Sequence, residues 1–72
     1  MNMSDDIVKA FNDQITLELT ADMTYRQLAI EADAQDLSGV ATWLRHQADE
    51  EIVHANKFID HVLDRGNHPR IG

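Results

Sequence analysis

The five residues QDLSG (35–39) separate two long stretches that carry apolar side chains at helical spacing. Glycine and proline are scarce elsewhere, because Gly39 is the only glycine before Gly66 and Pro69 is the only proline. A connection this short places the helices on either side of it next to each other and antiparallel. The sequence therefore predicts an all-α fold, an antiparallel two-helix hairpin with its turn at residues 35–39.

The stretch before the turn predicts one uninterrupted helix over about residues 5–34. Ser4 can cap its first turn, and Asp5 and Asp6 complement the helix dipole there. The apolar stripe of this helix has a three- and four-residue spacing with no helix breaker: Val8, Phe11, Ile15, Tyr25, Leu28, Ala29 and Ala32.

The stretch after the turn predicts a second helix over about residues 39–65, followed by a tail at 66–72. Gly66 offers a left-handed cap, and Pro69 is a stop signal three residues later. Both helices should be roughly 40–45 Å long, far above the usual length, which indicates a helical bundle. The apolar stripe of the second helix comprises Val40, Leu44, Ala48, Ala55, Phe58 and Val62.

Further apolar residues lie outside these two stripes, so the apolar surface is wider than one hairpin can cover. A chain of 72 residues without cysteine also lacks disulfides to stabilise a small core. We therefore expect a homo-oligomer, a dimer of hairpins or larger, in which a second copy completes a four-helix bundle. The residues outside the stripes are Ile7, Leu17, Leu19, Met23, Ile30, Trp43, Ile52, Ile59 and Leu63.

Composition limits the possible partners and location. The net charge is −7 and the six basic residues are scattered, whereas nucleic-acid binding calls for clustered Lys and Arg. The apolar runs are too short to span a membrane, and the opening residues MNMSDD do not resemble a signal peptide. The expectation is a cytoplasmic protein that contacts neither nucleic acid nor membrane.

Three polar residues occupy positions where the apolar pattern expects core. Glu18 lies seven residues from both Phe11 and Tyr25, and Glu51 takes the equivalent place in the stripe of the second helix, with His54 three residues on. An unpaired buried carboxylate costs several kcal/mol, and a bound cation is the simplest compensation. In an antiparallel hairpin, Glu18 and Glu51 are offset by roughly 6 Å along the axis, which long side chains can span.

One chain supplies three such ligands, and two chains related by a two-fold axis supply four Glu and two His. This is the ligand set of a di-iron carboxylate bundle, with two ions per four helices. Oxygen and imidazole donors without thiolate suit iron or manganese better than structural zinc. Two alternatives remain from the residues alone: Glu18 could pair with Arg26 or Arg45, and a different helical phase would expose Glu51 and His54.

The segments FNDQITLELTADMTYRQ (11–27) and WLRHQADEEIVHANKFIDHVLDRGNHPRI (43–71) resemble the first two helices of ferritins, in particular the non-haem bacterial ferritins. The resemblance covers residues 7–71. It implies the N-terminal half of a ferritin-like bundle, in which Fe(II) is oxidised by dioxygen or peroxide and ferric mineral is stored inside a hollow cage.

The resemblance also implies roles for individual residues. Glu18, Glu51 and His54 would bind iron at the ferroxidase centre, with Glu51 bridging the two ions. Tyr25 would hydrogen-bond a ligand and take part in electron transfer. Glu50 matches a residue that helps to hold a third iron in some bacterial members.

Two features depart from the ferritin pattern. The third and fourth helices, with their ligands, are missing, so the chain is expected to be a fragment, an engineered half, or a hairpin whose second copy replaces the missing half as in encapsulated ferritins. Ile52 stands where bacterioferritins carry the haem-ligating Met, so no haem is expected, and Asp22 is an acid where relatives often have a small residue. The alternative function is a non-catalytic helical hairpin or oligomerisation module with vestigial ligands.

Overall fold

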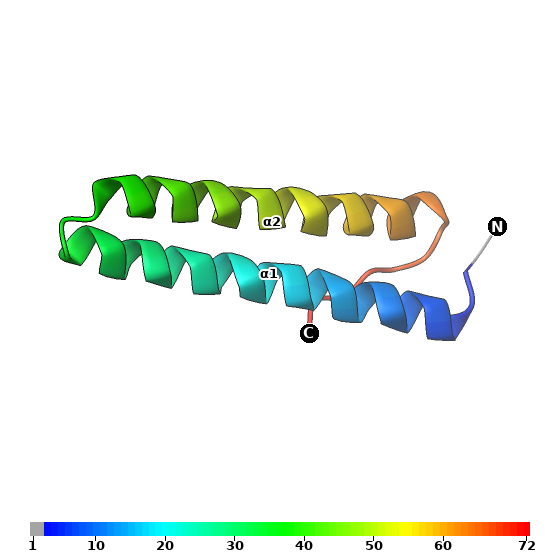
Figure 1. Cartoon of the computed structure of the whole chain (residues 1–72). Coiled ribbons are helices and arrows are strands. Elements are labelled where there is room, and N and C mark those ends of the chain that lie inside the picture. Colours follow the sequence, from blue (N-terminus) through cyan, green and yellow to red (C-terminus); the bar gives the residue numbers. More distant parts are fainter. Residues whose placement is uncertain (1–2) are drawn as a thin grey trace.

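The computed structural model describes residues 3–72 as two long helices and a short tail. Helix α1 covers Asp5–Ala34 and helix α2 covers Ser38–Asp64, and the two run antiparallel side by side (Figure 1). Over the described residues there is no β-strand. The hairpin is 51 Å long and only 17 by 11 Å across. The predicted all-α hairpin is confirmed.

The turn between the helices is tighter than the sequence indicated. Ser38 is already helical, because the amide of Ala41 bonds the Leu37 carbonyl at 2.9 Å and starts α2 one residue earlier than expected. At its other end α2 stops at Asp64 rather than at residue 65. Only residues 35–37 therefore connect the helices, which keeps α2 close against α1 from its first turn.

The C-terminal end of α1 reverses the chain through a left-handed residue. Asp36 has a φ of 60°, and its amide donates to the carbonyl of Asp33 at 3.0 Å, while the Leu37 amide donates to that of Ala32 at 2.9 Å. These two bonds form a Schellman motif, which normally carries glycine at the left-handed position. The reversal thus depends on an aspartate in a conformation that L-residues disfavour.

The C-terminal end of α2 uses the same motif with the expected glycine. Gly66 has a φ of 75°, its amide donates to the Leu63 carbonyl at 2.9 Å, and the Asn67 amide donates to the Val62 carbonyl at 3.1 Å. The cap predicted at Gly66 is confirmed.

The N-terminal end of α1 is capped and tied to the tail. Ser4 accepts a hydrogen bond from the Ile7 amide at 3.3 Å through its hydroxyl, as its position in the sequence predicts. The amide of Met3 donates to the side-chain oxygen of Asn67 at 2.9 Å. This contact joins the residue before the N-cap of α1 to the tail that follows α2.

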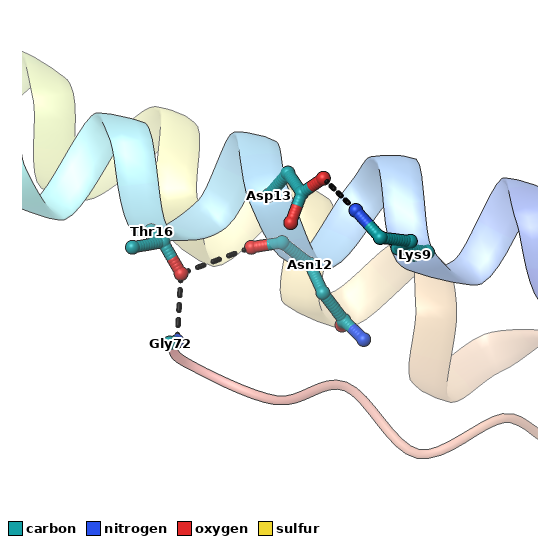
Figure 2. A network of polar contacts seen from close by, with 5 residues as sticks. All are labelled: Lys9, Asn12, Asp13, Thr16 and Gly72. Atoms are coloured by element: carbon teal, nitrogen blue, oxygen red, sulfur yellow. Dashed lines mark hydrogen bonds and ion pairs between the residues drawn. The ribbon is translucent and has the colours of Figure 1, made fainter.

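The tail after α2 returns along α1 (Figure 1). The Arg70 amide donates to the side-chain oxygen of Asn12 at 2.9 Å, and the Gly72 amide donates to the Thr16 hydroxyl at 2.7 Å. Figure 2 shows that the same hydroxyl bonds the Asn12 carbonyl, at 3.1 Å. Two polar side chains of α1 therefore accept hydrogen bonds from two backbone amides of the tail, which is not itself helical.

The seam between the helices is narrow because it is built largely from alanine. Small side chains let two helix backbones approach closely. Ile15, Leu44 and Val62 are the larger residues among those buried between them. Leu28 and Val40, expected in the stripes, are 48% and 49% exposed, because they lie at the edges of the seam. The buried residues are Ile15, Ala29, Ala32, Ala41, Leu44, Ala48, Ala55 and Val62.

The hairpin leaves much of its apolar surface uncovered, as its composition predicts. Leu17 is 60% exposed and Trp43 is 57% exposed. Of the other residues outside the stripes, Leu19, Ile52 and Ile59 are only partly covered. None of the described helices is both long enough and apolar enough to cross a membrane. The remaining exposed members of that set are Ile7, Met23, Ile30 and Leu63.

The left-handed residue of the turn provides a test of this fold. We expect Asp36→Gly to raise the free energy of unfolding by about 0.5–1 kcal/mol, because glycine adopts positive φ without a steric penalty. Asp36→Ala removes the same carboxylate and keeps a Cβ, but it loses the short polar side chain that lets aspartate tolerate this conformation, so it should lower stability. Urea unfolding followed by circular dichroism at one protein concentration measures both. A gain in both variants would mean that charge, not backbone conformation, governs this position.

Candidate metal centre

Three side chains with metal-binding atoms converge across the seam. Glu18 comes from α1, and Glu51 and His54 come from successive turns of α2. Nδ1 of His54 lies 3.6 Å from Oε2 of Glu18 and 3.7 Å from Oε2 of Glu51. One ligand atom from each of the three residues lies within 4.8 Å of the others. An ion of ordinary size placed between these atoms could contact all three.

The register of the helices explains why these residues meet. Phe11 and Phe58 pack edge to face with their ring centroids 5.7 Å apart, and each lies seven residues from one of the two glutamates. Two helical turns on an antiparallel pair bring Glu18 level with Glu51. The aromatic pair thus sets the register on one side of the site, and the alanine seam keeps the backbones close on the other.

The site combines two sheltered carboxylates with an accessible imidazole. The side chains of Glu18 and Glu51 are 15% and 18% exposed, whereas that of His54 is 47% exposed. The carboxylates therefore lose most of their hydration, and the imidazole forms the open edge.

The two carboxyl groups perturb one another. The pKa of Glu18 is lowered, chiefly because its carboxylate shares a hydrogen bond with Glu51. The pKa of Glu51 is raised by the same hydrogen bond, and further by burial and by the negative charge of Glu18. One proton held between two carboxylates offsets their repulsion, and a bound cation can take over that role.

Gln14 contacts the site and was not identified from the sequence. Its side-chain amide donates a hydrogen bond of 2.9 Å to Oε1 of Glu18. The signal that could have found it is spacing, since a residue four positions before a helical ligand lies on the same face.

The contacts of two other predicted site residues, Tyr25 and Glu50, are with residues outside this group of three. Tyr25 packs in the core near the turn, against the cluster that includes Ala29 and Leu44. Glu50 lies on the outer side of α2, where its carboxylate is 3.8 Å from Nε2 of the exposed His46. The functions expected of Tyr25 and Glu50 therefore stay predictions.

The nearby arginines are occupied by other acids. Arg26 bridges Asp22 and Asp49 at 2.8 and 2.6 Å, and Arg45 pairs with Asp33. The alternative in which one of these arginines neutralises Glu18 is therefore not what the structure shows. Asp22, one turn beyond Glu18, belongs to an ion-pair network that links the helices beside the site.

In ferritin-like bundles, glutamates and a Glu-x-x-His pair on neighbouring helices project toward the bundle interior, and this hairpin carries side chains of the same types at its seam. Residues 8–72 match the ferritin family model, described as a ferritin-like domain. The chain belongs to the ferritin family, which confirms the resemblance noted in its sequence.

Similar proteins agree with this assignment. The chain is 33% identical over 66 residues to a bacterial non-heme ferritin of Escherichia coli O6:H1, and 36% identical over 66 residues to one of Staphylococcus haemolyticus. It also superposes on an open pore ferritin from the hyperthermophilic archaeon Archaeoglobus fulgidus, with a TM-score of 0.95 and 33% identity over 100% of this chain. It spans 40% of the two bacterial relatives and 44% of the archaeal chain.

The carboxylate pair predicts a specific pH dependence for the metal-free protein. Because the pKa of Glu51 is raised, its stabilising contribution is present below the ordinary value of 4.5 and is lost as the pH rises through the folded value. Glu18 has the opposite sign, since its lowered pKa contributes above 4.5 and is lost as the pH falls through the folded value. Glu51→Gln keeps an N–H donor for Glu18 but has no proton to lose.

We therefore expect the stability advantage of Glu51→Gln over the unmodified chain to grow as the pH rises from about 4 to about 7. Urea unfolding in the presence of a chelator measures this difference. Glu31→Gln, which removes one exposed charge elsewhere on α1, is the control and should show a nearly constant difference. An advantage of Glu51→Gln that stayed flat or shrank with pH would contradict the shared proton.

Proposed function

We propose that this protein binds iron and oxidises Fe(II) at a di-iron centre that two copies of the hairpin complete. The convergence of Glu18, Glu51 and His54 across the seam carries this proposal. Two sheltered carboxylates beside an imidazole suit Fe(II) and Fe(III), which favour oxygen and imidazole donors. Membership of the ferritin family supports iron as the metal.

One hairpin supplies half of a two-metal ligand set. A four-helix di-iron bundle uses four carboxylates and two histidines, and a two-fold pair of these hairpins would provide that number from Glu18, Glu51 and His54. We infer that each bundle takes two iron ions, about one per chain. The second copy would supply what the third and fourth helices supply in a longer chain.

The surface beside the site supports a helical partner. An open apolar groove of about 270 Å³ lies between the helices, lined by Ala10, Phe11, Gln14 and Phe58. Gln14 joins this groove to the ligands, because it also bonds Glu18. Covering the groove with a second hairpin would remove apolar surface from water and shelter the metals at the same time.

Fe(II) is the substrate in this proposal, and dioxygen or peroxide is the oxidant. Two Fe(II) ions side by side can deliver two electrons to one dioxygen molecule, which takes up two protons to become hydrogen peroxide. Glu51 would bridge the ions, Tyr25 would assist electron transfer, and Glu50 would help to hold a third iron. We place this activity in the cytoplasm, and we propose that oxidised iron is stored by a larger homo-oligomer.

Removing the central carboxylate tests the proposal. We expect Glu51→Ala to abolish stoichiometric Fe(II) binding and oxygen-dependent oxidation while the helices remain formed. The measurements are anaerobic iron titration, metal content per chain, and mass in solution on the same sample. Glu31→Ala is the matched control, because it removes an exposed acid of α1 and should leave binding unchanged. Retained stoichiometric binding in Glu51→Ala would refute the assignment.

The second candidate function is a non-catalytic hairpin that serves as an oligomerisation module. The exposed apolar residues and the open groove favour it independently of the acids. Thermal unfolding separates the two functions, since a ligand that binds only the folded state stabilises it by RT ln(1 + [L]/Kd), about 2.7 kcal/mol at 100 times Kd. Iron-dependent stabilisation supports the di-iron centre, and its absence in an assembled protein supports the module.

Tyr25→Phe tests the proposed electron-transfer role. The substitution keeps the ring that packs near the turn and removes only the hydroxyl. We expect Fe(II) affinity and unfolding temperature to change little and the oxidation rate to fall, measured by stopped-flow absorbance after mixing with oxygen. An unchanged rate would leave Tyr25 as a packing residue only.

A further inference from the structure

The two oxygens of the Glu18 carboxylate face different partners, and Gln14 is one of them. Its amide nitrogen lies 2.9 Å from Oε1, while Oε2 faces Nδ1 of His54 at 3.6 Å. A carboxylate held at one oxygen has little freedom to rotate, so the other oxygen keeps its direction toward the site. Gln14 is thus placed to determine which oxygen of Glu18 meets the other ligands.

The surroundings of Gln14 strengthen this hydrogen bond. Gln14 is only partly exposed and lines the apolar groove together with Phe11 and Phe58. A partly buried amide donor competes with less water than a fully exposed one, and its contact with a carboxylate is stronger than one between neutral groups. The amide is also uncharged, so it orients the carboxylate without repelling a cation.

The same helix contains a matched hydrogen bond that has no connection with the site. Gln27 donates to the carboxylate of Glu31 at 3.0 Å, with the same four-residue spacing, but both residues are exposed. Comparison of Gln14 with Gln27 therefore separates an effect on the site from an effect on helix stability. The chain itself supplies the control.

We propose that Gln14 is a positioning residue that orients Glu18 for metal binding. This inference rests on the proposed function, because it requires that Glu18 bind a metal ion. Gln14 acts through Glu18 and is not itself counted among the ligands. Gln14 would thus support a metal ligand while it also lines the apolar groove.

The experiment compares Gln14→Met and Gln27→Met in the full chain, with Co²⁺ as a redox-inert probe. Methionine keeps the length and the apolar contacts of glutamine and removes the donor. We expect Co²⁺ to bind Gln14→Met roughly 10–100-fold more weakly than the unmodified chain, which is the usual cost of losing a group that supports a metal ligand. The visible absorption band of bound Co²⁺ should also change in shape, because Glu18 would bind in a different orientation. Gln27→Met should keep both affinity and spectrum.

Circular dichroism and mass in solution verify that each variant folds and assembles alike, and Gln14→Ala replaces Gln14→Met if the latter does not fold. An unmodified chain that does not bind Co²⁺ would overturn both this inference and the proposed function. Normal binding by the unmodified chain, with affinity and spectrum unmoved in Gln14→Met, would overturn this inference alone. An equal loss in Gln27→Met would also overturn it, because the effect would then not depend on Glu18.

Discussion

Two carboxylates face each other in a seam that is too narrow to hydrate them fully. Glu18 and Glu51 are brought together by a helix pair that packs on alanines, and each loses most of its contact with water. A proton or a cation between the two groups would offset their mutual repulsion. The register of the helices keeps the two carboxyl groups together, and the hydrogen bond that Gln14 donates stabilises the charge on Glu18. A fold selected for stability alone would gain by placing apolar residues at both positions.

A second hairpin would affect both the candidate metal site and the exposed apolar surface. The three candidate ligands of one hairpin are half of the set that the proposed two-metal centre needs, and apolar residues such as Leu17 and Trp43 remain in contact with water. A second hairpin over the groove would supply ligands and bury surface together. Assembly and metal binding are therefore expected to reinforce each other, since each lowers the cost of the other. The tail held on Asn12 and Thr16 fixes where the chain lies after α2.

The site was predictable to the extent that it depends on spacing within one helix. Glu51 and His54 share a face because they are three residues apart, and the short turn sets the approximate level of Glu18 opposite them. Gln14 was overlooked because its four-residue spacing from Glu18 places it on the same helix face but does not show that the two side chains are hydrogen-bonded. The edges of the seam were misjudged at Leu28 and Val40, because periodicity gives the direction of a stripe but not its width.

The sequence by itself determined the two helices, their caps at Ser4 and Gly66, and the antiparallel arrangement, because these follow from local spacing and from chemistry within a few residues. It also indicated Glu18, Glu51 and His54 as candidate ligands, and the structure brings these three side chains together. Only the tertiary structure decided that Arg26 and Arg45 bind other acids, that Asp36 adopts a left-handed conformation, and that the tail lies on α1. Each of these depends on how two surfaces meet at ångström precision. The periodicity of one helix carries no information about the partner that its side chains will find.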